Sequence, residues 1–170
     1  MLDKLFDFLI QFVALFKFWA VYEPFEAGVL LRLGTFIRVL EPGFHWRIPF
    51  GVDQCLSAQT VPTVHSLGDE SITTTDGKNI GFHAVVTFQV RDIKKALLDV
   101  SEVTHAVLDA CAGEVGRVLR EASWAEVMAP DMLDKLTKAC RARGFRYGIE
   151  VMQVQLAGVS LVRSIRLMQK

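Results

Sequence analysis

Side chains that could do acid–base, nucleophilic or metal chemistry are few in this sequence and widely spaced. The four histidines show no pair at the spacing of metal ligands, and we expect surface or structural roles for His45, His65, His83 and His105. A serine nucleophile needs a neighbouring base, and no Ser/His or Ser/Lys arrangement is visible. The adjacent carboxylates of Asp69 and Glu70 would point to opposite faces of a strand, which excludes a catalytic pair. An enzyme with a serine nucleophile, such as a serine protease, is therefore without support in the sequence.

Sequence motifs of catalytic and cofactor sites are also missing. There is no GxSxG, HExxH, CxxC, P-loop or GxGxxG pattern. The three cysteines, Cys55, Cys111 and Cys140, are an odd number without zinc-ligand spacing. We expect buried thiols in a reducing compartment, with no catalytic residue, no metal site and no cofactor.

Composition limits the class of protein. The chain has 170 residues, enough for one domain with room for two lobes. Its formal net charge of zero argues against a nucleic-acid binder, and its 51% hydrophobic content argues against a disordered chain. The mean hydropathy of +0.30 is high for a soluble monomer. We therefore expect apolar surface to be buried in a membrane or a subunit interface.

The first 21 residues are predicted to form a membrane-anchoring apolar helix. The apolar run over residues 5–21 would span about 26 Å as a helix, less than the roughly 30 Å of a bilayer core. Trp19 and Tyr22 are typical of a membrane–water interface, so a helix lying in the interface is favoured over a clean span. The alternative is an amphipathic helix that packs on its own domain or on a neighbour. The anchoring side chains would be Leu5, Phe6, Leu9, Ile10, Phe12, Val13, Phe16, Phe18 and Trp19.

Periodicity along the rest of the chain indicates an α+β fold. A short strand is expected over residues 29–33, and Asp76-Gly77 predicts a tight hairpin in which both residues have positive φ. Phe82, Ala84, Val86, Phe88 and Val90 alternate with mostly polar residues, as in a half-buried strand. A strand bulge is expected between Val151 and Val154. The expected helices run from Asp92 to Leu98, from Ser101 onward, from the Ser123–Glu126 capping box, and from Asp131 to Gly144.

Charge is distributed unevenly along the chain. The last 33 residues carry a net charge of +6 and the others −6, with an acidic segment at 99–134 directly before a basic run. We expect a head-to-tail contact between copies, with a small-residue patch allowing close approach. Three alternatives stay open: the two helices pair within one chain, the basic residues form a solvated face, or they dock on anionic lipid. The predicted interface residues are Gly113, Gly116, Glu114, Glu121, Arg141, Arg143 and Arg146.

Several segments of the chain resemble one known family. They are Gly28-Val29, Arg32-Leu33-Gly34, Pro42-Gly43-Phe44-His45, Ile48-Pro49-Phe50, Asp53, Thr75-Asp76-Gly77, residues 86–92 and Gly148-Ile149-Glu150-Val151 with Val154. In this order they resemble the SPFH or band 7 domain of stomatin, prohibitin, flotillin and HflK/HflC proteins. The matched segments cover most of residues 21–160.

The resemblance implies both a fold and a function. It implies two small SPFH lobes of antiparallel-rich sheet with packed helices. The first lobe would be β-rich (22–70) and the second α/β (71–161). The membrane anchor (1–21) would precede the lobes, and a short tail (162–170) would follow them. We expect this tail to be too short for the long coiled coil that is typical of the family. The implied function is a non-enzymatic scaffold, a large homo-oligomer that forms a ring or cage on the cytoplasmic side of a bilayer and organises a membrane patch. The alternative is an accessory subunit that encloses and regulates a membrane protease or another membrane protein.

Overall fold

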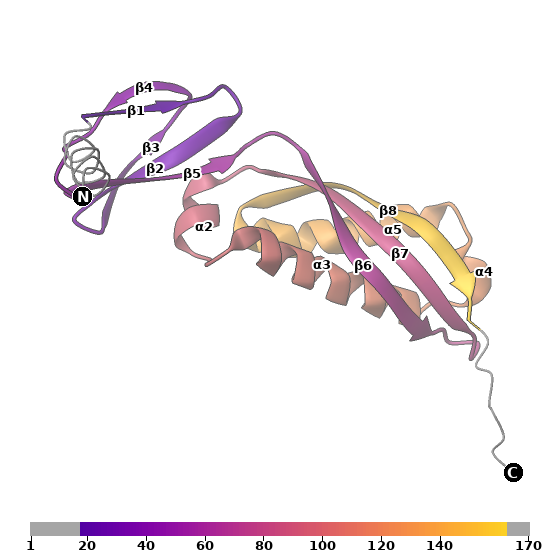
Figure 1. Cartoon of the computed structure of the whole chain (residues 1–170). Helices are drawn as coiled ribbons and strands as arrows, with labels where there is room; N and C mark the ends of the chain where they lie inside the picture. Colours follow the sequence, from indigo (N-terminus) through magenta and orange to yellow (C-terminus); the bar gives the residue numbers. More distant parts are fainter. Residues whose placement is uncertain (1–17, 163–170) are drawn as a thin grey trace, which may run out of the picture.

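The fold of the chain is α+β, and its sheets are antiparallel. The computed structural model describes residues 18–162. Within that range an all-β first lobe lies at one end of an elongated molecule, and a larger second lobe of one sheet and several helices forms the rest (Figure 1).

The first lobe is a two-stranded ribbon packed on a three-stranded sheet. In the ribbon β1 (Trp19–Tyr22) pairs with β4 (Gly43–Trp46). The sheet has the order β3 (Thr35–Leu40), β2 (Glu26–Arg32), β5 (Asp53–Gln59). Tyr22, Leu30 and Leu40 form a small buried cluster that holds the ribbon against this sheet.

The second lobe is a sheet with helices on one face. The sheet has the order β6 (Thr63–Thr73), β7 (Asn79–Val90), β8 (Ile149–Leu161). The predicted alternation in β7 is confirmed, because Phe82, Ala84, Val86 and Phe88 are buried under the helices. The helices are α2 (Ile93–Leu98), α3 (Val103–Arg120), α4 (Trp124–Val127), α5 (Asp131–Gly144) and the 3-10 turn η1 (Phe145–Tyr147). No helix within residues 18–162 covers the other face of the sheet (Figure 1).

Helix starts follow the local chemistry of the sequence. The Asp92 side chain accepts a hydrogen bond from the backbone N–H of Lys95 and caps α2. Ser123 and Glu126 form the predicted capping box of α4. In α5, acidic residues occupy the first turn and basic residues the last, as the helix dipole favours.

The predicted N-terminal helix does not continue to residue 21. Trp19–Tyr22 form β1, because their backbone groups pair with β4, which lies more than twenty residues further along the chain. Seven of the predicted anchoring residues lie outside the described range: Leu5, Phe6, Leu9, Ile10, Phe12, Val13 and Phe16. Within residues 18–162, no helix is both long and apolar enough to cross a membrane.

Element boundaries differ from the expectations in three further places. Strand β6 runs through the expected lobe boundary at residues 70 and 71 and pairs with β7, so the chain enters the second sheet at Thr63. Strand β2 ends at Arg32, because Leu33 turns the chain with a φ of 49°. Helix α3 begins at Val103 after Glu102, whose φ of 53° is also left-handed.

The hairpin between β6 and β7 is wider than predicted. Gly77 has a φ of 73°, but Asp76 does not have a positive φ, so the two-residue turn was a wrong prediction. The Thr74 N–H donates to the Lys78 carbonyl at 2.9 Å, and the Gly77 N–H donates to the Thr74 carbonyl at 3.0 Å. Because the loop is longer, only one left-handed residue is needed.

Three bulges change which side chains share a face of the second sheet: one in β6 and two in β8, of which one leaves Ala157 as an extra residue. In β8 Gln153 pairs with Thr87 and Val151 with Phe88, which leaves Met152 as the extra residue and confirms the predicted bulge. In β6 Ser66 pairs with Val85 and Asp69 with His83, so that Leu67 and Gly68 lie opposite Ala84 alone.

Candidate functional site

The ribbon of the first lobe carries an exposed apolar face. Trp19 lies opposite Trp46, and Val21 lies opposite Phe44, so that all four side chains point to one side of the ribbon. Val21 is 65% exposed and Trp46 is 68% exposed, although large apolar side chains are normally buried. The rings of Phe44 and Trp46 meet edge to face at 5.4 Å. This face is a rigid, solvent-exposed aromatic surface.

The opposite side of the ribbon packs on the core of the first lobe. Tyr22 is buried there, and its ring contacts that of His45 at 5.9 Å. Burial raises the pKa of the Tyr22 hydroxyl above its usual range. Because the inner side is held in this way, the outer aromatic side chains cannot turn inward.

Two turns beside the ribbon display apolar side chains on strained backbone. Leu33 has a φ of 49° and Phe50 a φ of 62°, and both side chains are mostly exposed. A left-handed conformation costs a residue with a side chain about 1–2 kcal/mol. The Leu33 N–H donates to the Val52 carbonyl at 2.8 Å, which places the two turns next to each other. Strain of this kind concentrates at functional sites.

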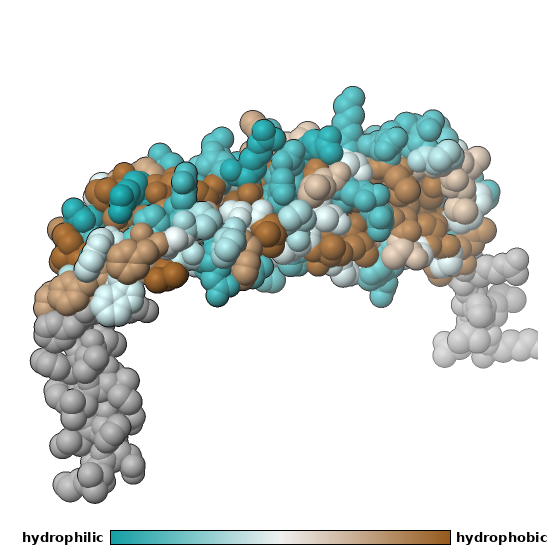
Figure 2. Space-filling model, turned by 90° about the horizontal axis from the view of Figure 1, so that it is seen from above, coloured by the Kyte–Doolittle hydropathy of each residue, from teal (hydrophilic) through white to brown (hydrophobic). Residues whose placement is uncertain are grey.

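These residues together form what we call the apolar tip surface. Brown, hydrophobic surface lies over the end of the molecule formed by the first lobe (Figure 2). The apolar tip surface consists of Phe18, Trp19, Val21, Leu33, Phe44, Trp46, Ile48 and Phe50. Phe18 and Trp19 are the two predicted anchoring residues that the structure describes.

An ion pair between a buried carboxylate and a half-exposed guanidinium holds the turns in place. Asp53 is buried and accepts hydrogen bonds from Arg32 Nε at 2.7 Å, from Arg32 Nη2 at 3.1 Å and from the Ile48 N–H at 2.7 Å. The hydrogen bond from Arg32 lowers the pKa of the Asp53 carboxyl below its usual range, against the opposing effect of burial. The loop that carries Phe50 begins at Ile48 and ends at Asp53. The hydrogen bond between these two residues closes the loop, and the ion pair with Arg32 holds it against β2.

The predicted interface residues are only partly available to another copy. The Glu114 carboxylate is buried and accepts hydrogen bonds from Arg117 and Arg143, so α3 and α5 pair within one chain. Arg141 donates to the carbonyls of Val151 and Met152 at the edge of β8. Gly116 is buried, whereas Gly113, Glu121 and Arg146 are exposed.

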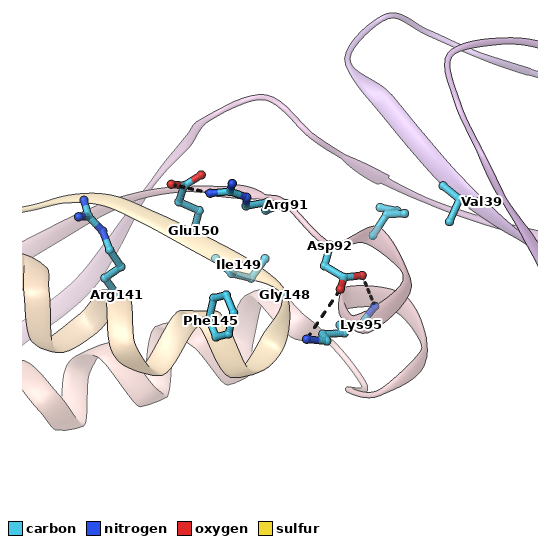
Figure 3. Close-up of a pocket in the computed structure, with 10 residues that line it drawn as sticks. Val39, Arg91, Asp92, Lys95, Arg141, Phe145, Gly148, Ile149 and Glu150 are labelled. Atoms are coloured by element: carbon cyan, nitrogen blue, oxygen red, sulfur yellow. Dashed lines mark hydrogen bonds and ion pairs between the residues drawn. The ribbon is translucent and has the colours of Figure 1, made fainter.

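A cavity of about 580 Å³ lies beside α2, η1 and the start of β8 (Figure 3). Arg91 pairs with Glu150 at 3.3 Å, and Lys95 pairs with Asp92 at 3.8 Å. Val39 of the first lobe forms part of the lining. The charged side chains of these two pairs already have partners in the chain, and the lining includes residues of both lobes. We therefore interpret the cavity as a gap at the contact between the first and the second lobe, and not as a ligand site.

One cluster of polar residues was missed by sequence reasoning. Ser66 Oγ lies 3.3 Å from His83 Nε2, and His83 Nδ1 lies 2.8 Å from Asp69 Oδ1. The expectation that the chain has no Ser/His arrangement is therefore wrong. The cluster depends on the β6 bulge and on pairing with β7, and neither is marked by a sequence motif.

Comparison with known proteins agrees with the fold. A family model described as the SPFH domain / Band 7 family matches residues 20–166. An uncharacterised protein of Methanocaldococcus jannaschii is 25% identical, over 93% of this chain and 81% of that protein. An uncharacterised protein of Archaeoglobus fulgidus is also 25% identical, and the match covers 93% of this chain and 65% of that protein. Since the family match spans most of the sequence, this chain belongs to the SPFH domain / Band 7 family.

Proposed function

We propose that this protein is a scaffold of the stomatin/prohibitin type that binds a bilayer through its first lobe and assembles there with other copies. The observation that carries the proposal is the apolar tip surface, where four side chains on one face of a short ribbon adjoin two strained apolar turns. A soluble surface would be expected to carry polar residues at such turns.

The chemistry of the apolar tip surface fits the headgroup region of a bilayer. Tryptophan is enriched at membrane interfaces, because its ring is apolar and its indole N–H can still donate a hydrogen bond. Complete burial of one large apolar side chain contributes about 1.5–3 kcal/mol. Several half-exposed side chains acting together would therefore bind without help from charge, and this contribution adds to that of any anchor in residues 1–17.

Assembly is the second part of the proposal. Family membership supports it, and so does the exposed position of Gly113 on α3, where an added Cβ would meet no atom within 4 Å. Cys111 and Cys140 are buried free thiols, which is consistent with a lobe on the cytoplasmic side. In this arrangement many first lobes would touch one bilayer patch and organise its lipids.

The three tryptophans of the chain provide a direct test of the membrane contact. Trp19 and Trp46 belong to the apolar tip surface, whereas Trp124 begins α4 in the second lobe. The full chain is bound to vesicles containing brominated acyl chains, which quench tryptophan only at close range. A variant with Trp46 as its sole tryptophan (Trp19→Phe, Trp124→Phe) should be quenched.

The matched control keeps only Trp124 (Trp19→Phe, Trp46→Phe) and should stay bright on the same vesicles. Equal fluorescence of the Trp46 variant on brominated and ordinary vesicles, with the protein still bound, would show that the first lobe does not touch lipid. The contact should also persist at high salt, since it does not depend on charge.

A further inference from the structure

The open face of the second sheet carries three side chains in one hydrogen-bonded row. Ser66 Oγ lies 3.3 Å from His83 Nε2, and His83 Nδ1 lies 2.8 Å from Asp69 Oδ1. Serine is thus joined to one nitrogen of the imidazole and a carboxylate to the other. This order of contacts is the one that lets a histidine act as a base toward a serine hydroxyl.

The positions of the protons follow from the partners. An ionised Asp69 can only accept a hydrogen bond, so the proton of the neutral imidazole lies on Nδ1. His83 Nε2 is then an acceptor and faces the Ser66 hydroxyl. The Gly68 N–H donates to Ser66 Oγ at 3.0 Å, which occupies a lone pair of that oxygen and leaves its proton for His83. Such a donor also stabilises negative charge on Oγ.

The bulge in β6 creates this arrangement. In a regular strand Ser66 and Asp69 would point to opposite faces, because they are three residues apart. The two residues Leu67 and Gly68 lie opposite the single residue Ala84, and this restores both side chains to the face of His83. Gly68 has a φ of 86°, a conformation that glycine adopts without strain. Glu70, next to Asp69, points to the helical side, where its carboxylate lies close to Gly116.

A hollow adjoins the row on the side of β8. Its volume is about 430 Å³, and Asp69, Gly81, His83, Gly158 and Ser160 contribute to its lining. Gly158 is the cross-strand neighbour of His83, and a Cβ added to it would meet no atom within 4 Å. Missing side chains therefore leave space beside the imidazole. The hollow is shallow and open, and Asp69 and His83 line it, whereas Ser66 stands at its margin on β6, so a substrate that reaches both Ser66 and the hollow must be small.

We propose that Ser66, His83 and Asp69 form a nucleophilic site that hydrolyses small, neutral carboxylic esters. The proposal goes beyond the scaffold function and does not depend on it. Ser66 and His83 are the catalytic residues. Asp69 is a positioning residue that holds the imidazole with its proton on Nδ1.

The reaction has two steps. Ser66 Oγ forms a bond to the acyl carbon of the ester while His83 Nε2 takes the hydroxyl proton. The bond from the acyl carbon to the leaving oxygen then breaks, and the alcohol departs with the proton from His83. Water next adds to the acyl carbon of the acyl-serine and gives a proton to His83. The bond to Ser66 breaks, Oγ recovers the proton, and the carboxylic acid is released.

The test uses the full chain in detergent with p-nitrophenyl acetate as substrate. The wild type should release nitrophenol faster than buffer does. Ser66→Ala and His83→Ala should reduce the rate to that of buffer. Asp69→Asn should slow turnover about tenfold or more and change the pH profile, since general-base catalysis contributes about 10²–10⁴-fold.

Ser71→Ala is the matched control, because Ser71 is an exposed serine on the same face of β6. The rate of this variant should equal that of the wild type.

A second measurement does not depend on the folding of variants. A fluorophosphonate probe reacts with activated serines, and peptide mass spectrometry of the labelled wild type should place the adduct on Ser66. Wild-type hydrolysis no faster than buffer, activity that persists in Ser66→Ala, or a label on a serine other than Ser66 would each overturn the proposal.

Discussion

Glu114 of α3 and Arg143 of α5 form a hydrogen-bonded ion pair within one chain. The carboxylate is almost completely buried, whereas the guanidinium of Arg143 is half exposed. Arg117, one turn along α3, donates to the other oxygen of the same carboxylate at 2.7 Å. Glu114 thus joins the acidic and basic helices whose charges, taken from the sequence alone, had suggested a contact between copies.

Removal of the Glu114 charge should weaken the second lobe. Glu114→Gln replaces the shared carboxylate with a neutral amide that has only one acceptor oxygen, and the free energy of unfolding should fall by about 1–3 kcal/mol, the size of a hydrogen bond to a charged group. Urea unfolding followed by circular dichroism measures this change. Glu121→Gln is the control, because Glu121 bonds the same Arg117 from an exposed position and should change stability by less than about 0.5 kcal/mol. Equal effects of the two variants would contradict the prediction.

The same carboxylate should make stability depend on pH. The hydrogen bonds from Arg117 and then Arg143 lower the pKa of Glu114, although burial acts in the opposite direction. Because the pKa is lower in the folded state, the stabilisation is complete above the unfolded value of about 4.3 and is lost as pH falls through the folded pKa. Between about pH 6 and pH 3, the wild type should therefore lose more stability than Glu114→Gln. Parallel curves for the two proteins would exclude Glu114 as the titrating group.

Asp53 should control the rigidity of the apolar tip surface. Asp53→Asn loses the ion pair with Arg32 and weakens the bond from the Ile48 N–H, at a cost of about 1–3 kcal/mol. Hydrogen exchange of the amides in residues 48–52 should become faster, because the loop loses its fixed end. Glu41→Gln removes an exposed carboxylate of the same lobe and should leave that exchange unchanged.

Gly148 joins the start of β8 to the start of α2 and should not tolerate a side chain. It has a φ of 73°, and an added Cβ would lie 2.6 Å from the Asp92 carbonyl oxygen. Its own carbonyl accepts hydrogen bonds from the backbone N–H groups of Arg91 and Asp92, both at 2.9 Å. Gly148→Ala should cost about 2 kcal/mol or more and lower Tm by roughly 4–8 °C in a thermal melt. Gly158→Ala is the matched control, since its site is open and its φ is not positive, and its Tm should stay close to that of the wild type.

Features coded by neighbouring residues were predictable from the sequence. The Asp92 cap, the Ser123–Glu126 box and the inward alternation of β7 each depend on side chains a few positions apart. The resemblance that identified the family also included Arg32 and Asp53, but only the folded chain shows that they form an ion pair.

Features that depend on distant pairing were not predictable. The end of the apolar run, from Trp19 onward, fits a helix as well as a strand, and its pairing with β4 makes it a strand. The exposed face of the ribbon follows from that same pairing. The row of Ser66, His83 and Asp69 needs a bulge that no short motif specifies. Glu114 and Arg143 could pair within a chain or between chains, and local charge alone does not decide between the two.

The structure also changes how assembly through charge is best tested. Arg143 and Arg141 are occupied within the chain, so reversing their charge would damage the fold as well as any interface. Arg146 is exposed in η1, directly after the basic helix α5, and Glu121 is exposed at the end of the acidic helix α3. We predict that detergent-solubilised protein forms a discrete large oligomer in mass photometry and that Arg146→Glu weakens it. A second change, Glu121→Lys, should restore the oligomer by re-creating opposite charges across the contact.

The expected effect of Arg146→Glu on one contact is small, because an exposed ion pair contributes about 0–1 kcal/mol. A closed assembly repeats the contact at every subunit, so the population of the complete oligomer should fall steeply as protein is diluted. Lys138→Glu makes the same charge change within α5 and separates a specific contact from an effect of net charge. If Lys138→Glu dissociates the oligomer as readily as Arg146→Glu, or if Glu121→Lys fails to restore it, the contact does not join these two helix ends. A monomer at every protein concentration would contradict assembly itself.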